Sequence, residues 1–406
     1  MNTTTPTTAI STWLQPLRAV LDPADRIDWE RLALLEAELD DVLGSFPIGP
    51  QLPAGPLRSD RLRSIRVELA ARGQLDTDRH PALFALLAQF ACGYRDIDLR
   101  DATGLGHGAL IARHGSPATR QRWIPRLRTG ELAGIAMTEP HGGSRPAAAR
   151  TCAVTTRDGT WLISGRKTWI SRLTEASVFV VFFRAPDGRL AAATVDAAEP
   201  GLHRQPIQPT GLAGWSWGIL DLDCVPVRSD DILHGDAMAL LRKHFAGYRP
   251  LVAATALGGA AAVFDEVVAN LANRYISGEV ARLWDSALVT VGRAHARLVT
   301  ALLGTVLADR KAEVGHEHAE RWSAVMKAHG IDTANQTTSE LTLLLGARGF
   351  QSDSHVAKVR RDLNGLLYAD GIHDSLYRAA GKQHTTHSNT ATETGSRSLA
   401  ALSASA

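Results

Sequence analysis

Two short runs of residues have the composition of a binding site: Met137–Ser144 and Lys167–Ser171. The first run places hydroxyl side chains on both sides of two adjacent glycines. Because glycine has no Cβ and accepts any φ, backbone N–H groups in such a loop can approach an anionic or carbonyl-rich ligand closely. The second run ends an alternating segment, and at strand spacing its Trp169 and Ser171 side chains face the same way. The sequence therefore predicts a ligand-binding loop beside a strand that offers one aromatic ring and one hydroxyl.

Taken together, the two runs resemble the flavin-binding segments of the acyl-CoA dehydrogenase superfamily. Further matches follow in the family's order, over roughly residues 60–380: His114–Pro117, Gln121–Leu127, Val225–Val227, Arg249-Pro250, Arg274-x-x-x-Gly278, Gly346–Phe350 and Arg361-Asp362. A series of motifs in a fixed order is more specific than any one of them. The resemblance implies FAD as the cofactor. The run Gly142-Gly143-Ser144 is not G-x-G-x-x-G, so we expect no Rossmann domain.

The resemblance also assigns cofactor-binding residues along the chain. These are Met137, Thr138, Gly143, Ser144, Trp169, Ser171, Arg274, Gly346 and Gly349. Thr138 would donate to the edge of the isoalloxazine ring, Trp169 would form a wall beside it, and Ser171 would hydrogen-bond near N5. Arg274 would reach the pyrophosphate of the FAD in a neighbouring subunit, which implies a homodimer or a homotetramer. The chain departs from the family pattern at Arg145, Ser171, Leu343 and Ala347.

The catalytic base of the family falls on Asp370 when residues are counted without a gap from Arg361-Asp362. That base removes the proton from the carbon α to a thioester while hydride leaves the β-carbon. Asp is one methylene shorter than the usual Glu, so its carboxylate would lie about 1.5 Å further back. The alternative is that Asp370 caps a helix over residues 372–378. Some members carry the base just before Arg249, where this chain has Tyr248. The expected substrate-binding residues are Tyr248, Arg249 and Gly371.

We therefore expect an FAD-dependent oxidoreductase that dehydrogenates an acyl thioester between its α- and β-carbons. The acyl group would be carried by CoA, or by an acyl carrier protein in a biosynthetic pathway. Ala246 and the run Gly371–Asp374 depart from CoA-binding members, and an oxidase branch of the superfamily uses Asp as its base. A flavin-dependent oxidase or oxygenase acting on a non-CoA substrate is therefore an alternative, with His373 as a further acid–base group. A third alternative is a catalytically degenerate scaffold that uses the fold only for binding.

The elements that must position these residues predict an α+β protein in three parts. Helical periodicity predicts an N-terminal helical domain over residues 13–136. Residues 137–235 predict an antiparallel β-domain, with hairpin turns at Asp158-Gly159 and Asp187-Gly188. Long apolar stripes over residues 236–382 predict a C-terminal four-helix bundle. The polar ends, residues 1–12 and 383–406, are expected to be disordered.

Composition sets limits that agree with two or three domains. The chain has 406 residues, 45% of them hydrophobic, and a formal net charge of only +2, which gives no case for nucleic acid or an anionic membrane. We expect no signal peptide at the start, which has no basic and no apolar region, and no uninterrupted apolar stretch long enough to span a bilayer. Three widely spaced cysteines predict no disulfide framework and no metal site, with Cys92 and Cys224 buried. A reducing, cytoplasmic setting is expected.

Overall fold

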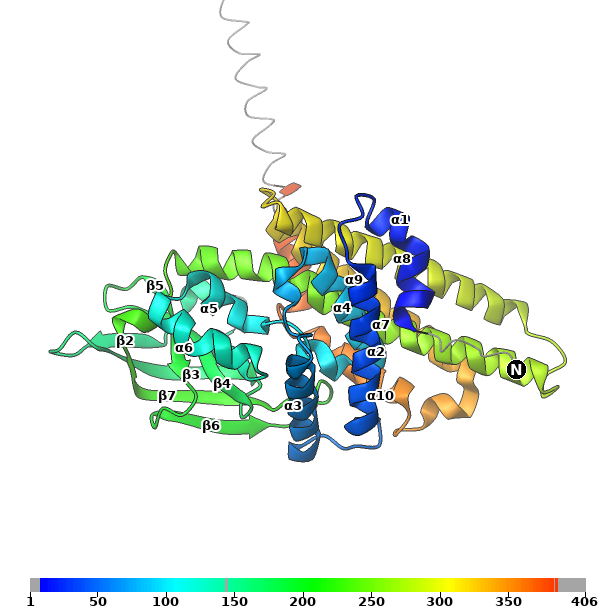
Figure 1. Cartoon of the computed structure of the whole chain (residues 1–406), viewed down its shortest axis with the longest axis horizontal. Helices are drawn as coiled ribbons and strands as arrows, with labels where there is room; N and C mark the ends of the chain where they lie inside the picture. Colours follow the sequence, from blue (N-terminus) through cyan, green and yellow to red (C-terminus); the bar gives the residue numbers. More distant parts are fainter. Residues whose placement is uncertain (1–7, 143–144, 383, 386–406) are drawn as a thin grey trace, which may run out of the picture.

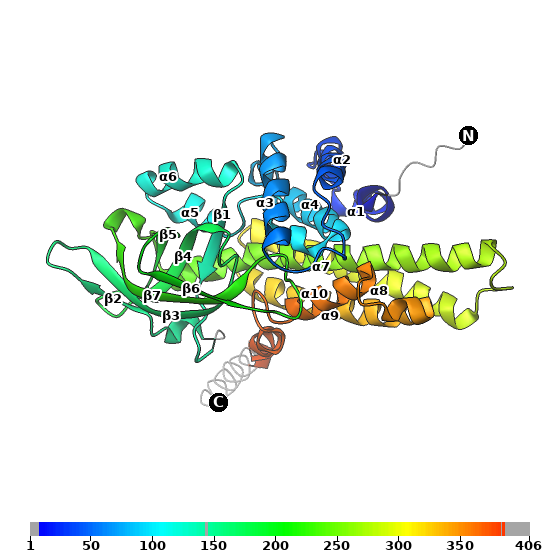
Figure 2. The same cartoon turned by 90° about the horizontal axis from the view of Figure 1, so that it is seen from below.

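The computed structural model describes residues 8–142, 145–382 and 384–385, and it has the three expected parts (Figure 1). Helices from the N-terminal part lie beside a β-sheet domain. Long C-terminal helices extend away from the sheet, and the turn between α7 and α8 lies at the far end (Figure 2). The α+β fold class predicted from the sequence is confirmed.

The N-terminal part is built from helices, with short 3-10 turns between α3 and α4 and between α4 and α5. They are α1 (Arg18–Leu21), α2 (Trp29–Ser45), α3 (Pro56–Ala71), α4 (Ala82–Arg95), α5 (Ala109–His114) and α6 (Pro117–Arg128). Helix α2 begins where the Asp28 side chain accepts a hydrogen bond from the N–H of Arg31 at 2.8 Å. This N-cap satisfies a backbone donor that the helix itself cannot pair.

The predicted disorder of residues 1–12 is wrong for the last of these residues. A short helical turn, η1 (Ile10–Leu14), begins there, and Ala9 and Ile10 are buried. The backbone N–H groups of Ala9 and Ile10 donate to the two carboxylate oxygens of Glu36 at 2.7 and 3.2 Å. The Thr-rich composition hid this turn because its partner lies on a different helix. Residues 1–7, 383 and 386–406 lie outside the described residues.

The described part of the chain forms a seven-stranded sheet in the order β1-β4-β2-β3-β7-β6, with β5 also paired to β4. The strands are β1 (Leu132–Ala136), β2 (Cys152–Thr155), β3 (Trp161–Ser171), β4 (Ala176–Arg184), β5 (Leu190–Asp196), β6 (Leu202–Ile207) and β7 (Trp217–Val227). Hairpins join β2 to β3 and β4 to β5 at the two predicted Asp-Gly turns. Strand β1 departs from the antiparallel expectation because it runs parallel to β4, and it begins before the expected boundary at residue 137.

Strand β4 is buried on both faces of the sheet. Val178, Val180 and Phe182 pack into the large core that also contains Trp123 of α6. The alternate residues of β4, such as Phe179, pack into a second core on the opposite face. This follows from the two-residue period of a strand. Figure 2 shows α5 and α6 over one face of the sheet.

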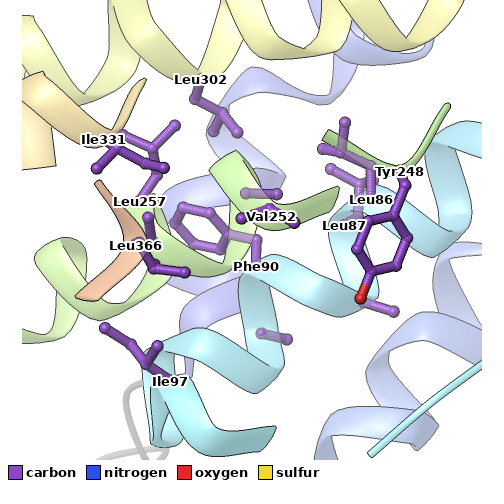
Figure 3. Packing of buried hydrophobic residues seen from close by; sticks show 14 of the residues in the cluster. Leu86, Leu87, Phe90, Ile97, Tyr248, Val252, Leu257, Leu302, Ile331 and Leu366 are labelled. Atoms are coloured by element: carbon purple, nitrogen blue, oxygen red, sulfur yellow. The ribbon is translucent and has the colours of Figure 1, made fainter. Parts of the chain in front are cut away.

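The C-terminal part confirms the predicted bundle of long helices. These are α7 (Ala237–Ile276), α8 (Asp285–Glu313), α9 (Ala319–Thr342) and α10 (His355–Leu366), with the 3-10 segment η8 (Leu343–Phe350) before α10. Helix α7 packs so closely against α4 that a Cβ on Gly258 would lie 2.1 Å from the carbonyl oxygen of Phe90. Figure 3 shows the core that results, with Phe90, Leu257 and Leu366 in one cluster.

Helix α7 and the cysteines bear on what the sequence predicts about hydropathy and burial. Helix α7 is long and apolar enough to cross a membrane, although 72% of its most apolar window is buried inside the protein. Ala and Gly supply much of that stretch, so it packs as a core helix between its neighbours. Cys92 is buried as expected, but Cys224 is exposed. Cys224 has a φ of 51° at an irregularity between β3 and β7, and such a bulge turns a side chain outward.

Candidate active site

A cavity of about 1030 Å³ lies where the β-domain meets the C-terminal helices. Its walls come from the loop after β1, the ends of β3 and β7, the β6–β7 loop, the first part of α7, the start of α9 and the chain after α10. Sites for single small molecules occupy roughly 300–1,000 Å³. This cavity is at the upper limit, so it can hold a large cofactor together with a substrate.

A buried ion pair anchors the loop after β1. Met137 and Thr138 of this loop line the cavity, whereas Gly143 and Ser144 lie outside the described residues. Glu139 accepts a hydrogen bond from Lys167 Nζ at 2.8 Å. It also accepts from two backbone N–H groups of the chain before β2, at 2.7 and 3.0 Å. Burial alone would raise the pKa of Glu139, but Lys167 and the backbone donors outweigh it and lower the pKa to about 2.

Trp169 and Ser171 both line the cavity, as the sequence predicts. The strand between them is not regular, because its register shifts between Lys167 and Ile170 and Trp169 has a φ of 58°. The Trp169 side chain is 58% exposed, so a large aromatic ring is left open to the cavity. The bulge is held from the loop side, where the N–H of Thr168 donates to the carbonyl oxygen of Thr138 at 2.9 Å.

Arg172 was not singled out from the sequence, yet it connects several parts of the site. Its guanidinium donates to the Ser171 hydroxyl at 2.8 Å and to both carboxylate oxygens of Asp101 at 2.7 and 2.6 Å. A further contact at 3.5 Å reaches the Tyr248 hydroxyl. Burial alone would lower the pKa of Arg172, but the Asp101 carboxylate outweighs it and raises the pKa. Arg172 therefore stays a cation and fixes the Ser171 hydroxyl.

Asp370 lines the cavity from the turn that follows α10. Its φ of 54° and the φ of 115° at Gly371 turn the chain sharply. The next helix begins at His373, and the Asp370 carboxylate makes no hydrogen bond with the described residues. The alternative of a helix cap is therefore wrong. The Asp370 backbone is held instead, because its carbonyl oxygen accepts from Arg249 Nε at 3.1 Å.

Lys327 of α9 holds the same turn from the other side. Its Nζ donates to the carbonyl oxygens of Leu366 and Gly371, both at 2.9 Å, and its side chain is fully buried. Burial lowers the pKa of Lys327 to about 7, and the Asp370 carboxylate opposes this shift in part. No pattern in the sequence signals this contact, since Lys327 is one polar residue within a long helix.

Two of the three expected substrate-binding residues line the cavity. Arg249 and Gly371 line the cavity, whereas Tyr248 does not. Tyr248 is buried in the core cluster of Figure 3, its hydroxyl lies 3.5 Å from the Arg172 guanidinium, and burial raises the pKa of this hydroxyl. Its ring stacks on His244, whose Nε2 lies 3.0 Å from His107 Nδ1. Burial lowers the pKa of His244 to about 3, so the histidine pair is neutral at pH 7.

Other predicted residues lie away from the cavity. Arg274 is in the last turn of α7, where its Nε contacts Glu279 Oε1 at 2.9 Å. Gly346 and Gly349 are in η8, and neither lines the cavity. His373, the further acid–base candidate, places its Nε2 2.7 Å from Asp332 Oδ2 and does not line the cavity either.

Asp362, from the Arg361-Asp362 motif, belongs to a buried ion network. Three carboxylates, those of Asp96, Asp98 and Asp362, have oxygens within 4.8 Å of one another. Arg58 and Lys358 pair with these carboxylates at 2.5 to 3.0 Å, so cations already lie among them. Asp362 Oδ1 also accepts from a backbone N–H of the β6–β7 loop at 2.7 Å. The network thus ties the N-terminal helices and α10 to a loop that lines the cavity.

Comparison with known families agrees with this geometry. The acyl-CoA dehydrogenase middle-domain model matches residues 134–225, and the acyl-CoA dehydrogenase C-terminal-domain model matches residues 236–383. These two matches take in more than half of the chain. The chain therefore belongs to the acyl-CoA dehydrogenase superfamily.

Individual relatives are distant. The chain is 26% identical over 281 residues to the mitochondrial very long-chain specific acyl-CoA dehydrogenase of Rattus norvegicus, a match over 66% of this chain and 43% of that protein. The chain thus spans less than half the length of this relative. Its fold is similar to butyryl-CoA dehydrogenase from Megasphaera elsdenii, with a TM-score of 0.75, 20% identity and coverage of 88% of this chain and 97% of the other. The fold is also similar to a glutaryl-CoA dehydrogenase from Mycobacterium smegmatis in complex with FADH2. The TM-score is 0.76, the identity is 19%, and the match covers 90% of this chain and 97% of the other.

Proposed function

We propose that this chain is an FAD-dependent oxidoreductase that dehydrogenates an acyl thioester between its α- and β-carbons. One observation carries the proposal: Asp370, Trp169 and Ser171 come from distant parts of the chain and line a single cavity. Membership of the acyl-CoA dehydrogenase superfamily supports both the cofactor and the reaction. A structural neighbour in complex with FADH2 supports the cofactor further.

Thr138, Trp169 and Ser171 would hold the isoalloxazine ring. A bound ring would cover the exposed face of Trp169, which is otherwise an uncovered apolar surface. Ser171 accepts a hydrogen bond from Arg172, so its own hydroxyl proton remains free to donate to a ligand. When bound, FAD supplies the acceptor for the hydride that leaves the β-carbon.

Asp370 would remove the proton from the α-carbon. Its carboxylate faces the cavity, and Arg249 and Lys327 fix the backbone that carries it. A general base must first be placed correctly and then have a suitable pKa. Arg249 and Lys327 supply the placement, because each donates to a carbonyl oxygen of the turn and leaves the carboxylate without a hydrogen bond from either of them.

A second copy of the chain would complete the site. Arg274 lies at the end of α7 that points away from the sheet (Figure 2). Large apolar side chains near the ends of these elements are exposed: Ile276, Trp284, Leu343 and Phe350. Apolar surface of this kind marks an interface. We propose a homodimer or homotetramer in which the partner subunit's Arg274, with the η8 segment, contacts the FAD pyrophosphate.

One alternative function has support from the cavity itself. The inner wall contains Arg100, His107 and Arg172, which is a polar lining for an acyl-chain site. An oxidase or oxygenase that uses Asp370 on a non-CoA substrate would fit such a wall. It would form stoichiometric hydrogen peroxide or an oxygenated product in air, whereas a dehydrogenase keeps its reduced flavin while product is bound.

The proposed function is tested by absorbance spectroscopy during anaerobic addition of acyl thioesters. The purified protein should be yellow, and thioesters carried by CoA or by an acyl carrier protein should bleach the oxidised flavin. Failure of every thioester to bleach a flavin-loaded protein would refute the dehydrogenation. A colourless protein from cells supplied with riboflavin would favour the degenerate scaffold. The cytoplasmic location and the choice of carrier stay predictions.

A further inference from the structure

We propose that the terminal helix, residues 373–382, is a lid over the cavity and that Asp332 of α9 is the latch that holds it closed. This inference rests on the proposed function, because it describes how an acyl thioester enters and leaves that same site.

The terminal helix forms part of the cavity wall. Ser375, Leu376 and Ala380 line the cavity from this helix, and Leu376 and Ala380 are buried. Tyr377 and Arg378 of the same helix are exposed. Figure 2 shows the helix, coloured red, at the edge of the molecule beside the bundle. The helix therefore lies between the cavity and the solvent.

The start of the terminal helix is anchored to the turn that carries Asp370. Lys327 donates to the Gly371 carbonyl oxygen at 2.9 Å. The N–H of His373 donates to the Leu367 carbonyl oxygen at 3.0 Å. Gly371 has a φ of 115°. Because glycine accepts a wide range of φ and ψ, this residue can serve as the hinge about which the helix pivots.

Beyond its start, the terminal helix has little apolar packing with the described residues. Leu376 packs with Ala324 and Ala328 of α9 in a small core that is separate from the main core. Two alanines offer little apolar area, so this packing stabilises the closed position weakly. Segments with few buried apolar contacts open more readily than the rest of a protein.

A single carboxylate of α9 reaches the terminal helix at two positions one turn apart. Asp332 Oδ2 accepts a hydrogen bond from the Tyr377 hydroxyl at 3.0 Å and lies 2.7 Å from His373 Nε2. Burial and the Asp332 carboxylate raise the pKa of Tyr377, so its hydroxyl keeps its proton at neutral pH. The Asp332 side chain is about half exposed, so water can replace these contacts. A contact that joins two elements and can be broken in this way suits a latch.

The latch is tested by trypsin cleavage of the FAD-loaded protein at Arg378, followed by mass spectrometry. A protease cuts within a helix when the helix opens, so the rate tracks the open population. Asp332→Asn keeps the size of the side chain and removes its charge, so cleavage should become about 10-fold faster. Glu340→Gln is the matched control, because Glu340 lies on the same helix and pairs with Arg297 at 2.7 Å. The control should be cleaved at the wild-type rate.

Quenching of the flavin fluorescence by iodide tests whether the helix covers the cavity. Asp332→Asn should have a larger quenching constant, because an open lid exposes the bound flavin, whereas Glu340→Gln should match the wild type. In anaerobic flavin reduction by octanoyl-CoA, Asp332→Asn should raise the concentration that gives half the maximal rate by about 10-fold. The maximal rate should stay nearly unchanged, since saturating thioester closes the lid again.

The outcomes separate the latch, the lid and the reaction. Equal cleavage at Arg378 in Asp332→Asn and in the wild type overturns the latch. Faster cleavage with unchanged quenching means that the helix opens without covering the cavity, which overturns the lid. If octanoyl-CoA bleaches neither protein, the cleavage and quenching measurements still decide the inference, because they need no substrate.

Discussion

Replacement of Lys167 by Met should destabilise the protein and loosen the loop that carries Thr138. Lys167 is fully buried and donates to Glu139 at 2.8 Å and to the carbonyl oxygen of Phe182 at 2.5 Å. The variant leaves the buried Glu139 carboxylate with two backbone donors and no counter-charge. Breaking a buried ion pair by removing one partner costs about 3–5 kcal/mol. Urea unfolding at pH 7 should show a loss of this size, together with lower FAD content.

The matched control removes both charges. Glu139→Gln combined with Lys167→Met should be more stable than Lys167→Met alone, because no unpaired charge remains buried. The ion pair also makes the stability of the protein depend on pH, in a direction that follows from the lowered pKa of Glu139. Because the folded pKa of Glu139 is lowered from 4.5 to about 2, its contribution is present above pH 4.5 and is lost as the pH falls towards 2. A loss below 1 kcal/mol in Lys167→Met, with unchanged FAD content, would refute this account of the loop.

Three further predictions concern stability and cofactor retention. Burial raises the pKa of Asp309 to about 7, so the folded protein should lose stability as the pH rises from 4 through 7. Asp309→Asn should flatten this pH dependence, measured as the unfolding free energy at several pH values. Gly258→Ala should lower the unfolding free energy by about 1–3 kcal/mol because its Cβ would meet the Phe90 carbonyl oxygen, whereas Gly44→Ala, in open space, should be neutral or gain up to about 1 kcal/mol. Arg274→Ala should weaken FAD retention by about 1.5–3 kcal/mol, measured as flavin per subunit after gel filtration, and an unchanged ratio would mean that Arg274 only pairs with Glu279.

Local patterns predicted the elements that contain the site. The Asp-Gly turns and the apolar stripes of the bundle depend on neighbouring residues, so the sequence alone is enough to find them. The resemblance to a family then gave the order of the motifs and led to Asp370, Trp169 and Ser171. These three residues do line one cavity.

The polar contacts inside the protein could not be predicted in the same way. Lys167 is far from Glu139 in the sequence, and Arg172 is far from Asp101. The residues around one partner do not predict the other. The left-handed backbone at Trp169 is imposed by tertiary contacts, because tryptophan does not favour it; at Asp370 the residue type tolerates this conformation but does not by itself predict it. The parallel pairing of β1 with β4 likewise depends on the path of the chain between them.

The central claim is that Asp370 removes the α-proton of an acyl thioester. It is tested most directly by the rate of anaerobic flavin reduction in Asp370→Asn, with Asp374→Asn as the control, since Asp374 is exposed and does not line the cavity. The account predicts that Asp370→Asn keeps its FAD and is reduced two to four orders of magnitude more slowly, in the range expected for loss of a placed base. The control should be reduced at the wild-type rate. Reduction of Asp370→Asn at the wild-type rate would contradict the account.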